Sequence, residues 1–130
     1  MLSLPISLAV VHFIGDFVLQ VDWMALGKSK NTKAGLITLT THVLVYATCF
    51  LWLGLSFAAI TFITHWITDF VTSRITSRLF PFVPDDSEYS IEWYNMNGQE
   101  GRSNHWFFVA IGADQLIHVV TLAWTYSWLI

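Results

Sequence analysis

The chain has 130 residues, of which 55% are hydrophobic and 12% are charged, with a formal net charge of −3 and a mean hydropathy of +0.56. A soluble domain usually has about a quarter of its residues charged, so this composition is typical of a membrane protein and argues against a water-soluble domain. The negative charge and the lack of a basic stripe also argue against a nucleic-acid-binding protein.

Four apolar stretches are long enough to cross the hydrocarbon of a bilayer, which takes roughly 20 helical residues. They are residues 4–21, 36–53, 55–71 and 106–130. Because they fill most of the chain, the sequence predicts a single all-α domain over residues 1–130, a bundle of four transmembrane helices. No Lys or Arg precedes the first stretch, so we expect it to be a span rather than a cleaved signal peptide.

The basic residues predict the topology. They fall in two places, the loop after the first stretch and the segment before the last: Lys28, Lys30, Lys33, Arg74, Arg78 and Arg102. Since cytoplasmic loops carry the excess of Lys and Arg, both termini are predicted on the outer side, and the loop 80–104 on the cytoplasmic side. The three lysines are interpreted simply as this topology signal.

The first stretch carries His12, Asp16 and Gln20 at four-residue spacing. Residues four apart lie on the same side of a helix, so these side chains share one face. The other three stretches have polar faces of the same kind, which carry His42, His65, Asp69, Asp114 and His118. An ionisable group at membrane depth costs about 2.5 kcal/mol or more, and such groups usually face the interior of a bundle.

The order of the polar pairs reverses with the direction of the chain. The first and third stretches contain His-x-x-x-Asp, whereas the fourth, which runs the opposite way, contains Asp-x-x-x-His. This reversal places the three carboxylates in one layer, nearer the cytoplasm, and His12, His65 and His118 one turn deeper. His42 falls close to the same zone, so we expect all four polar faces to meet in one cluster.

Buried carboxylates need positive charge nearby, and no Lys or Arg lies within the four stretches, so the candidates are imidazolium and a metal ion. Imidazole and carboxylate ligands suit zinc, manganese or iron, and the number of ligands allows one or two divalent ions. The predicted metal ligands are His12, Asp16, His42, His65, Asp69, Asp114 and His118. The predicted catalytic residues are Asp16, Asp69 and Asp114, and the predicted substrate contacts are Gln20, Gln115 and Arg74.

A bound divalent ion lowers the pKa of a coordinated water to about 7 and polarises a phosphoryl oxygen, which favours hydrolysis. A site in the cytoplasmic half of the membrane favours a lipid or lipid-linked phosphoester as the substrate. Two alternatives stay open: a non-enzymatic membrane protein that modulates host membrane or partner proteins, with a cluster that only pins the helices together, and a proton or ion conductor. The polar faces of so small a bundle also leave room for a homo-oligomer.

A resemblance to a known family is carried by four segments, HFIGDFVLQ, THVLVY, HWITDFVTSR and DQLIHVVTL. Together they resemble an uncharacterised family of small polytopic membrane proteins from bacteria and bacteriophages, a domain of unknown function. The resemblance implies a multi-pass protein of the bacterial inner membrane and implies no activity. A looser similarity to bacterial membrane-bound metal-dependent hydrolases, which present His and Asp from several short helices, implies the same seven ligands.

Overall fold

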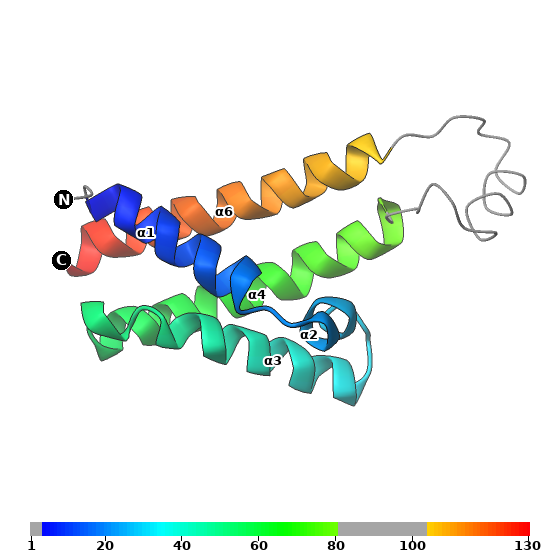
Figure 1. The fold of residues 1–130 in the computed structure, drawn as a ribbon, viewed down its shortest axis with the longest axis horizontal. Coiled ribbons are helices and arrows are strands. Elements are labelled where there is room, and N and C mark those ends of the chain that lie inside the picture. The colour runs from blue at the N-terminus through cyan, green and yellow to red at the C-terminus, as the bar shows by residue number, and fades with distance from the viewer. Residues whose placement is uncertain (1–3, 81–103) are drawn as a thin grey trace, which may run out of the picture.

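The computed structural model describes residues 4–80 and 104–130, and these residues are helical with no strand among them (Figure 1). In chain order the elements are α1 (Leu4–Phe13), the π-helical turn η1 (Ile14–Val18), α2 (Asp22–Gly27), α3 (Lys33–Thr48), the 3₁₀ turn η2 (Leu51–Leu53), α4 (Leu55–Leu79) and α6 (His105–Leu129). The predicted all-α class is confirmed. The predicted loop 80–104 lies almost entirely outside the described residues.

The long elements form an antiparallel bundle. α1 and α4 run in one direction, and α3 and α6 run in the other (Figure 1). α4 packs against both α3 and α6, while α1 packs on α6 and η1 packs on α3. The start of α1 and the end of α6 therefore lie at one end of the bundle, called here the terminal end. The end of α4 and the start of α6 lie at the opposite end, called the loop end.

Two helices, α4 and α6, are long and apolar enough to cross a membrane. Each has 25 residues, and at about 1.5 Å per residue this length exceeds the roughly 30 Å of a bilayer's hydrocarbon. By comparison, α1 has 10 residues and α3 has 16. Length and composition thus mark two of the four predicted spans as able to cross a membrane.

Two predicted boundaries differ from the structure. The helix predicted over residues 4–21 ends at Val18, because the chain widens into the η1 turn and is non-helical over residues 19–21 before α2, which packs on α3. The helix predicted over residues 55–71 continues to Leu79. The apolar run does stop near residue 71, but the polar turns beyond it stay helical because Arg74 is buried against the loop between α2 and α3.

The interior of the bundle has an apolar layer and a polar layer. The apolar layer lies toward the terminal end and is formed by Leu8, Tyr46, Phe50, Phe57 and Leu122. The polar layer follows toward the loop end, and the seven His and Asp side chains predicted to face inward are all buried. The outer surface carries large apolar side chains, among them Phe13, Ile63 and Val120, each more than half exposed. A polar interior under an apolar surface suits a lipid environment.

Candidate metal centre

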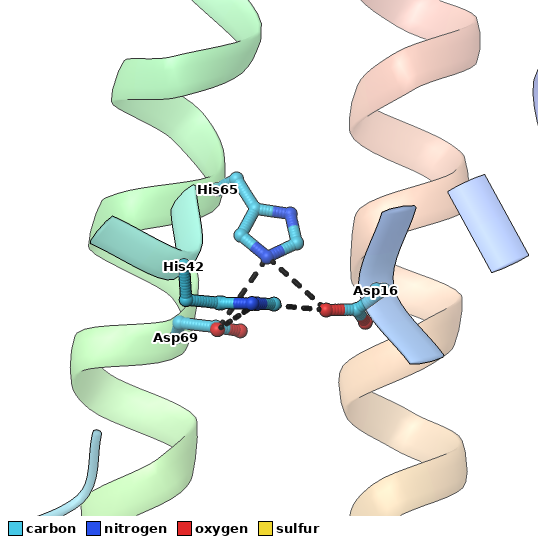
Figure 2. Close-up of side chains that lie close together, drawn as sticks. All are labelled: Asp16, His42, His65 and Asp69. Carbon is cyan, nitrogen blue, oxygen red and sulfur yellow. Dashed lines mark hydrogen bonds and ion pairs between the residues drawn. The ribbon is translucent and has the colours of Figure 1, made fainter. Parts of the chain in front are cut away.

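Six of the seven predicted ligands converge in two adjoining groups. The four-ligand group, drawn in Figure 2, consists of Asp16 from η1, His42 from α3, and His65 and Asp69 from α4. The three-ligand group consists of Asp16 again, with Asp114 and His118 from α6. In each group the ligand atoms all lie within 4.8 Å of one another. The convergence is confirmed, and ion binding by these residues remains a prediction.

The four-ligand group has the spacing of a metal site. His42 Nε2 lies 3.0 Å from Asp16 Oδ1 and 3.3 Å from Asp69 Oδ2. His65 Nε2 lies 3.4 Å from each of the same two oxygens (Figure 2). A tetrahedral zinc ion with bonds of about 2.0–2.1 Å separates its ligand atoms by roughly 3.3 Å. The four nitrogen–oxygen distances are close to this separation, so these atoms could hold one ion.

His65 supplies an independent sign of a missing partner. The residue is 1% exposed, and neither of its ring nitrogens has a hydrogen-bond partner among the described residues. Its ring is held in place by stacking on His118, with the ring centroids 3.9 Å apart. Because nearly all buried polar atoms in proteins are hydrogen-bonded, an unpartnered nitrogen held between two carboxylate oxygens is unusual. A cation in the four-ligand group would satisfy Nε2.

Asp69 links the two groups. Its Oδ2 faces His42 and His65, whereas its Oδ1 accepts a hydrogen bond from His118 Nε2 at 3.0 Å. The same His118 nitrogen lies 3.4 Å from Asp114 Oδ1. Asp16 belongs to both groups as well. Carboxylates that face two ligand sets are the kind of residue that bridges two ions about 3.5–4 Å apart, so the donors for a second ion are present.

Among the described residues, His12 belongs to neither group. Its Nδ1 lies 2.7 Å from the Tyr46 hydroxyl, and its Nε2 lies 2.7 Å from Gln115 Oε1. Gln115 donates its amide N–H groups to Asp16 Oδ2 at 2.9 Å and to Asp114 Oδ2 at 3.1 Å. With its nitrogen facing two carboxylates, Gln115 must accept from His12, so His12 is protonated on Nε2 and accepts from Tyr46. The structure thus places His12 outside both groups, with Tyr46 and Gln115 as its partners, and the ligand role predicted for it stays a prediction.

Gln115 and Arg74, two of the predicted substrate contacts, are occupied by the protein itself. Gln115 spans Asp16 and Asp114 as just described. The Arg74 guanidinium donates to Asn31 Oδ1 at 2.6 Å and to the carbonyl oxygen of Lys30 at 3.2 Å, and it lies over the Phe70 ring. Arg74 therefore fastens the loop between α2 and α3 to α4, and its donors face that loop.

Lys28 is the side chain of the site that the sequence reasoning missed. Its Nζ lies 3.0 Å from Asp69 Oδ2, the oxygen that also faces His42 and His65. Burial alone would lower the pKa of Lys28, but the charges of Asp69 and Asp16 outweigh this effect, so its pKa is raised and the side chain is a cation. The carboxylates thus have a basic partner from outside the spans, contrary to the prediction that only imidazolium or metal balances them.

The loop reaches the cluster because it packs tightly against the start of α3. A Cβ atom on Gly35 would lie 2.2 Å from the carbonyl oxygen of Lys30, so only glycine permits this approach. Thr32 caps α3 by accepting a hydrogen bond from the Gly35 N–H at 3.0 Å. The small residue and the cap in "KNTKAG" are the sequence signals of a folded loop, although they do not indicate where Lys28 points.

A cavity of about 400 Å³ opens beside the cluster, toward the loop end. Its polar lining includes Asp16, Asp69, Asp114, Lys28 and Gln20, and its apolar lining includes Phe17, Phe107 and Ile111. Ligand pockets commonly measure about 300–1,000 Å³, so this cavity has the size of a small-molecule pocket. Gln20 was predicted to contact substrate, and its Oε1 is buried with no hydrogen-bond partner in the described part of the chain.

A family described as a protein of unknown function, DUF3307, matches residues 4–130. The chain belongs to this family. No curated protein and no solved structure matches it. Membership in DUF3307 confirms the resemblance to a domain of unknown function and assigns no activity, so an argument about function depends on the site.

In this DUF3307 chain the described lining of the cavity has more acidic than basic side chains. Three carboxylates face the cavity and the histidines, and Lys28 is the one basic side chain in the described lining of the cavity. Water-excluding walls strengthen each charge interaction inside such a cleft. Asp114 stands at its margin, with Oδ1 accepting a hydrogen bond from the Thr72 hydroxyl and Oδ2 accepting from Gln115. The arrangement suits a divalent ion with a carboxylate beside it.

Proposed function

We propose that this DUF3307 protein is a metal-dependent hydrolase of the bacterial inner membrane that cleaves a phosphoester of a lipid or lipid-linked substrate. The observation that carries the proposal is the four-ligand group. The distances between imidazole nitrogens and carboxylate oxygens there are 3.0–3.4 Å, close to the ligand separation at a tetrahedral ion, and His65 has no hydrogen-bond partner in the described residues. The adjoining cavity has the size and the mixed lining that a lipid headgroup requires.

The proposal includes four membrane crossings with both termini outside. α4 and α6 have the length for full crossings, and α1 with η1 and α3 with η2 would make shorter ones beside them. Exposed tryptophans are carried by elements at both ends of the bundle: Trp52 by η2 and Trp124 and Trp128 by the last turns of α6, and, on the loop side, Trp23 by α2 and Trp106 by the first turn of α6. Belts of tryptophan at the two interfaces are typical of membrane proteins and support this placement.

A divalent ion in the four-ligand group would supply a polarised phosphoryl oxygen and a water of lowered pKa. The chain's own residues would do the rest. Gln115 holds the outer oxygens of Asp16 and Asp114 so that their other oxygens face the histidines. Asp114, at the cavity margin, is placed to accept a proton from a water in the cavity. Phe17 and Ile111 offer an apolar wall to an acyl chain.

The deciding experiment is the metal content of the detergent-purified protein, measured by elemental mass spectrometry. We expect near-stoichiometric zinc, manganese or iron in the native protein and in His105→Ala, which alters an exposed histidine at the start of α6 that belongs to neither ligand group. The His65→Ala/Asp69→Ala variant should lose the ion. If the native protein carries no metal and takes up none on incubation, the hydrolase proposal fails and the cluster is a packing network.

The structure gives proton or ion conduction less support. The hydrogen-bonded chain from Asp16 through Gln115 and His12 ends at the Tyr46 hydroxyl. Beyond Tyr46, toward the terminal end, lies the apolar layer that includes Phe50 and Leu122. Conduction along this chain would need the apolar layer to open.

A further inference from the structure

We propose that Lys28 binds the phosphate group of the substrate, and that it becomes available to phosphate only after a divalent ion takes over its place beside Asp69. The inference rests on the metal site of the proposed function and names how that site would acquire an anion. The inference is carried by one contact: the Lys28 ammonium group lies beside Asp69 Oδ2, a predicted metal-ligand oxygen, and both residues line the cavity.

Lys28 already belongs to the cavity. Its side chain is 17% exposed, and it lines the cavity together with Asp16, Asp69 and Asp114. Among the described residues of the lining, Lys28 is the single cation. Arg74, the other basic group nearby, is committed to Asn31 and to carbonyl oxygens of the loop. A phosphate that enters the cavity therefore has Lys28 as its basic partner.

The charges set the order of binding. With three carboxylates around one ammonium group, the cavity is anionic and repels phosphate. Asp69 Oδ2 serves both Lys28, at 3.0 Å, and the histidines of the four-ligand group. A divalent ion bound there would draw on the same oxygen, weaken its pair with Lys28 and cancel the net negative charge of the lining. The cation would bind first, and the phosphate second.

The backbone is built so that only the tip of Lys28 has to move. Arg74 donates to the carbonyl oxygen of Lys28 at 3.4 Å and to that of Lys30 at 3.2 Å, which fixes the loop on α4. The close approach at Gly35 fixes it on α3. Rotation about the side-chain bonds of Lys28 can then carry Nζ from Asp69 into the cavity, and lysine is a common ligand of phosphate as a compact point charge.

The test uses isothermal titration of the detergent-solubilised full chain, first with zinc or manganese and then with inorganic phosphate, for the native protein, Lys28→Met, Lys28→Arg and Lys33→Met. We expect the native protein to bind phosphate at least tenfold more tightly when the metal is present. Lys28→Met should bind the metal at least as tightly as the native protein and phosphate at least tenfold more weakly. Lys28→Arg keeps the charge and should keep phosphate binding, and Lys33→Met, at an exposed lysine, should behave as native.

A second arm replaces inorganic phosphate with a short-chain phosphatidic acid. Tighter binding of the lipid, weakened equally by Lys28→Met, identifies a lipid phosphate at Lys28, whereas equal affinity for both identifies free phosphate there. Either of two results for Lys28→Met overturns the inference: phosphate binding equal to that of the native protein, or loss of the metal. Phosphate binding by the native protein that is equally tight without metal overturns it as well. If circular dichroism shows that Lys28→Met does not fold, Lys28→Arg and Lys28→Gln take its place. Loss of phosphate binding in Lys28→Arg, or full phosphate binding in Lys28→Gln, then overturns the inference. Absence of metal binding in the native protein would overturn the proposed function itself.

Discussion

Replacing His65 by leucine distinguishes a metal centre from a metal-free polar network, because the two predict changes of opposite sign in the stability of the folded protein. His65 is buried, and its nitrogens have no hydrogen-bond partner among the described residues. In a metal-free protein, His65→Leu would remove an unsatisfied buried group, whose cost is about 1–3 kcal/mol, and the variant should equal or exceed the native protein in stability.

In the metal-loaded protein the same substitution removes a ligand. A single site filled at a free-ion concentration 1,000 times its Kd stabilises the folded state by about 4 kcal/mol. His65 Nε2 lies 3.4 Å from a carboxylate oxygen of both Asp16 and Asp69, so His65→Leu would leave one side of the ion without a ligand. We therefore expect His65→Leu to be less stable than the native protein by several kcal/mol with metal, and no less stable with chelator.

The assay is thermal unfolding in detergent, followed by tryptophan fluorescence, with and without a chelator and with His105→Leu as the control. Chelator should lower the Tm of the native protein and of His105→Leu and leave that of His65→Leu unchanged. A native Tm that ignores both added metal and chelator would refute the reasoning. So would an equal response of His65→Leu and the native protein to metal.

Two further substitutions test the supports of the site. Gln115→Leu leaves Oδ2 of Asp16 and Oδ2 of Asp114 without their amide donor, so a metal titration should show an affinity about 10- to 100-fold lower, with the site still filled at saturating metal. Unchanged affinity would mean that Gln115 does not orient the carboxylates. Arg74→Met removes the donors to the loop between α2 and α3, so hydrogen exchange should rise at residues 28–31 while helix content by circular dichroism stays native, and unaltered exchange there would contradict the fastening role.

The convergence of the buried His and Asp side chains could be predicted from the sequence. Helical spacing puts His65 and Asp69 on one face, and the reversed order of Asp114 and His118 puts their side chains at the same depth in an antiparallel neighbour. These are local regularities combined with chain direction, and both hold in the structure.

The roles of His12 and Lys28 could not be predicted in the same way. His12 precedes Asp16 by four residues, as His65 precedes Asp69. However, the π turn begins between His12 and Asp16, and the His12 ring is hydrogen-bonded to the Tyr46 hydroxyl and to Gln115. Lys28 lies in a loop whose path is set by contacts with Arg74 and Gly35. Arg74 is distant in sequence, and the close approach at Gly35 leaves no periodic pattern in the sequence. The end of α4 was missed because the apolar run is shorter than the helix.

The π turn at Ile14–Val18 also limits which changes of chain length the protein can accept. A π turn holds one residue more than an α-helical turn, so it is equivalent to a single-residue insertion accommodated within a helix. Deleting one residue there would restore an ordinary helix and leave the segments before and after the turn in register. Asp16 lies inside the turn, so the deletion must spare it to keep the carboxylate beside His42. Gly15, where a Cβ would lie 2.9 Å from the Tyr46 ring, adds a steric restriction at the same turn. Among homologues, a single-residue deletion at the π turn should therefore be accepted where Asp16 is kept, whereas one inside α1 would turn the residues on its two sides by about 100° relative to each other.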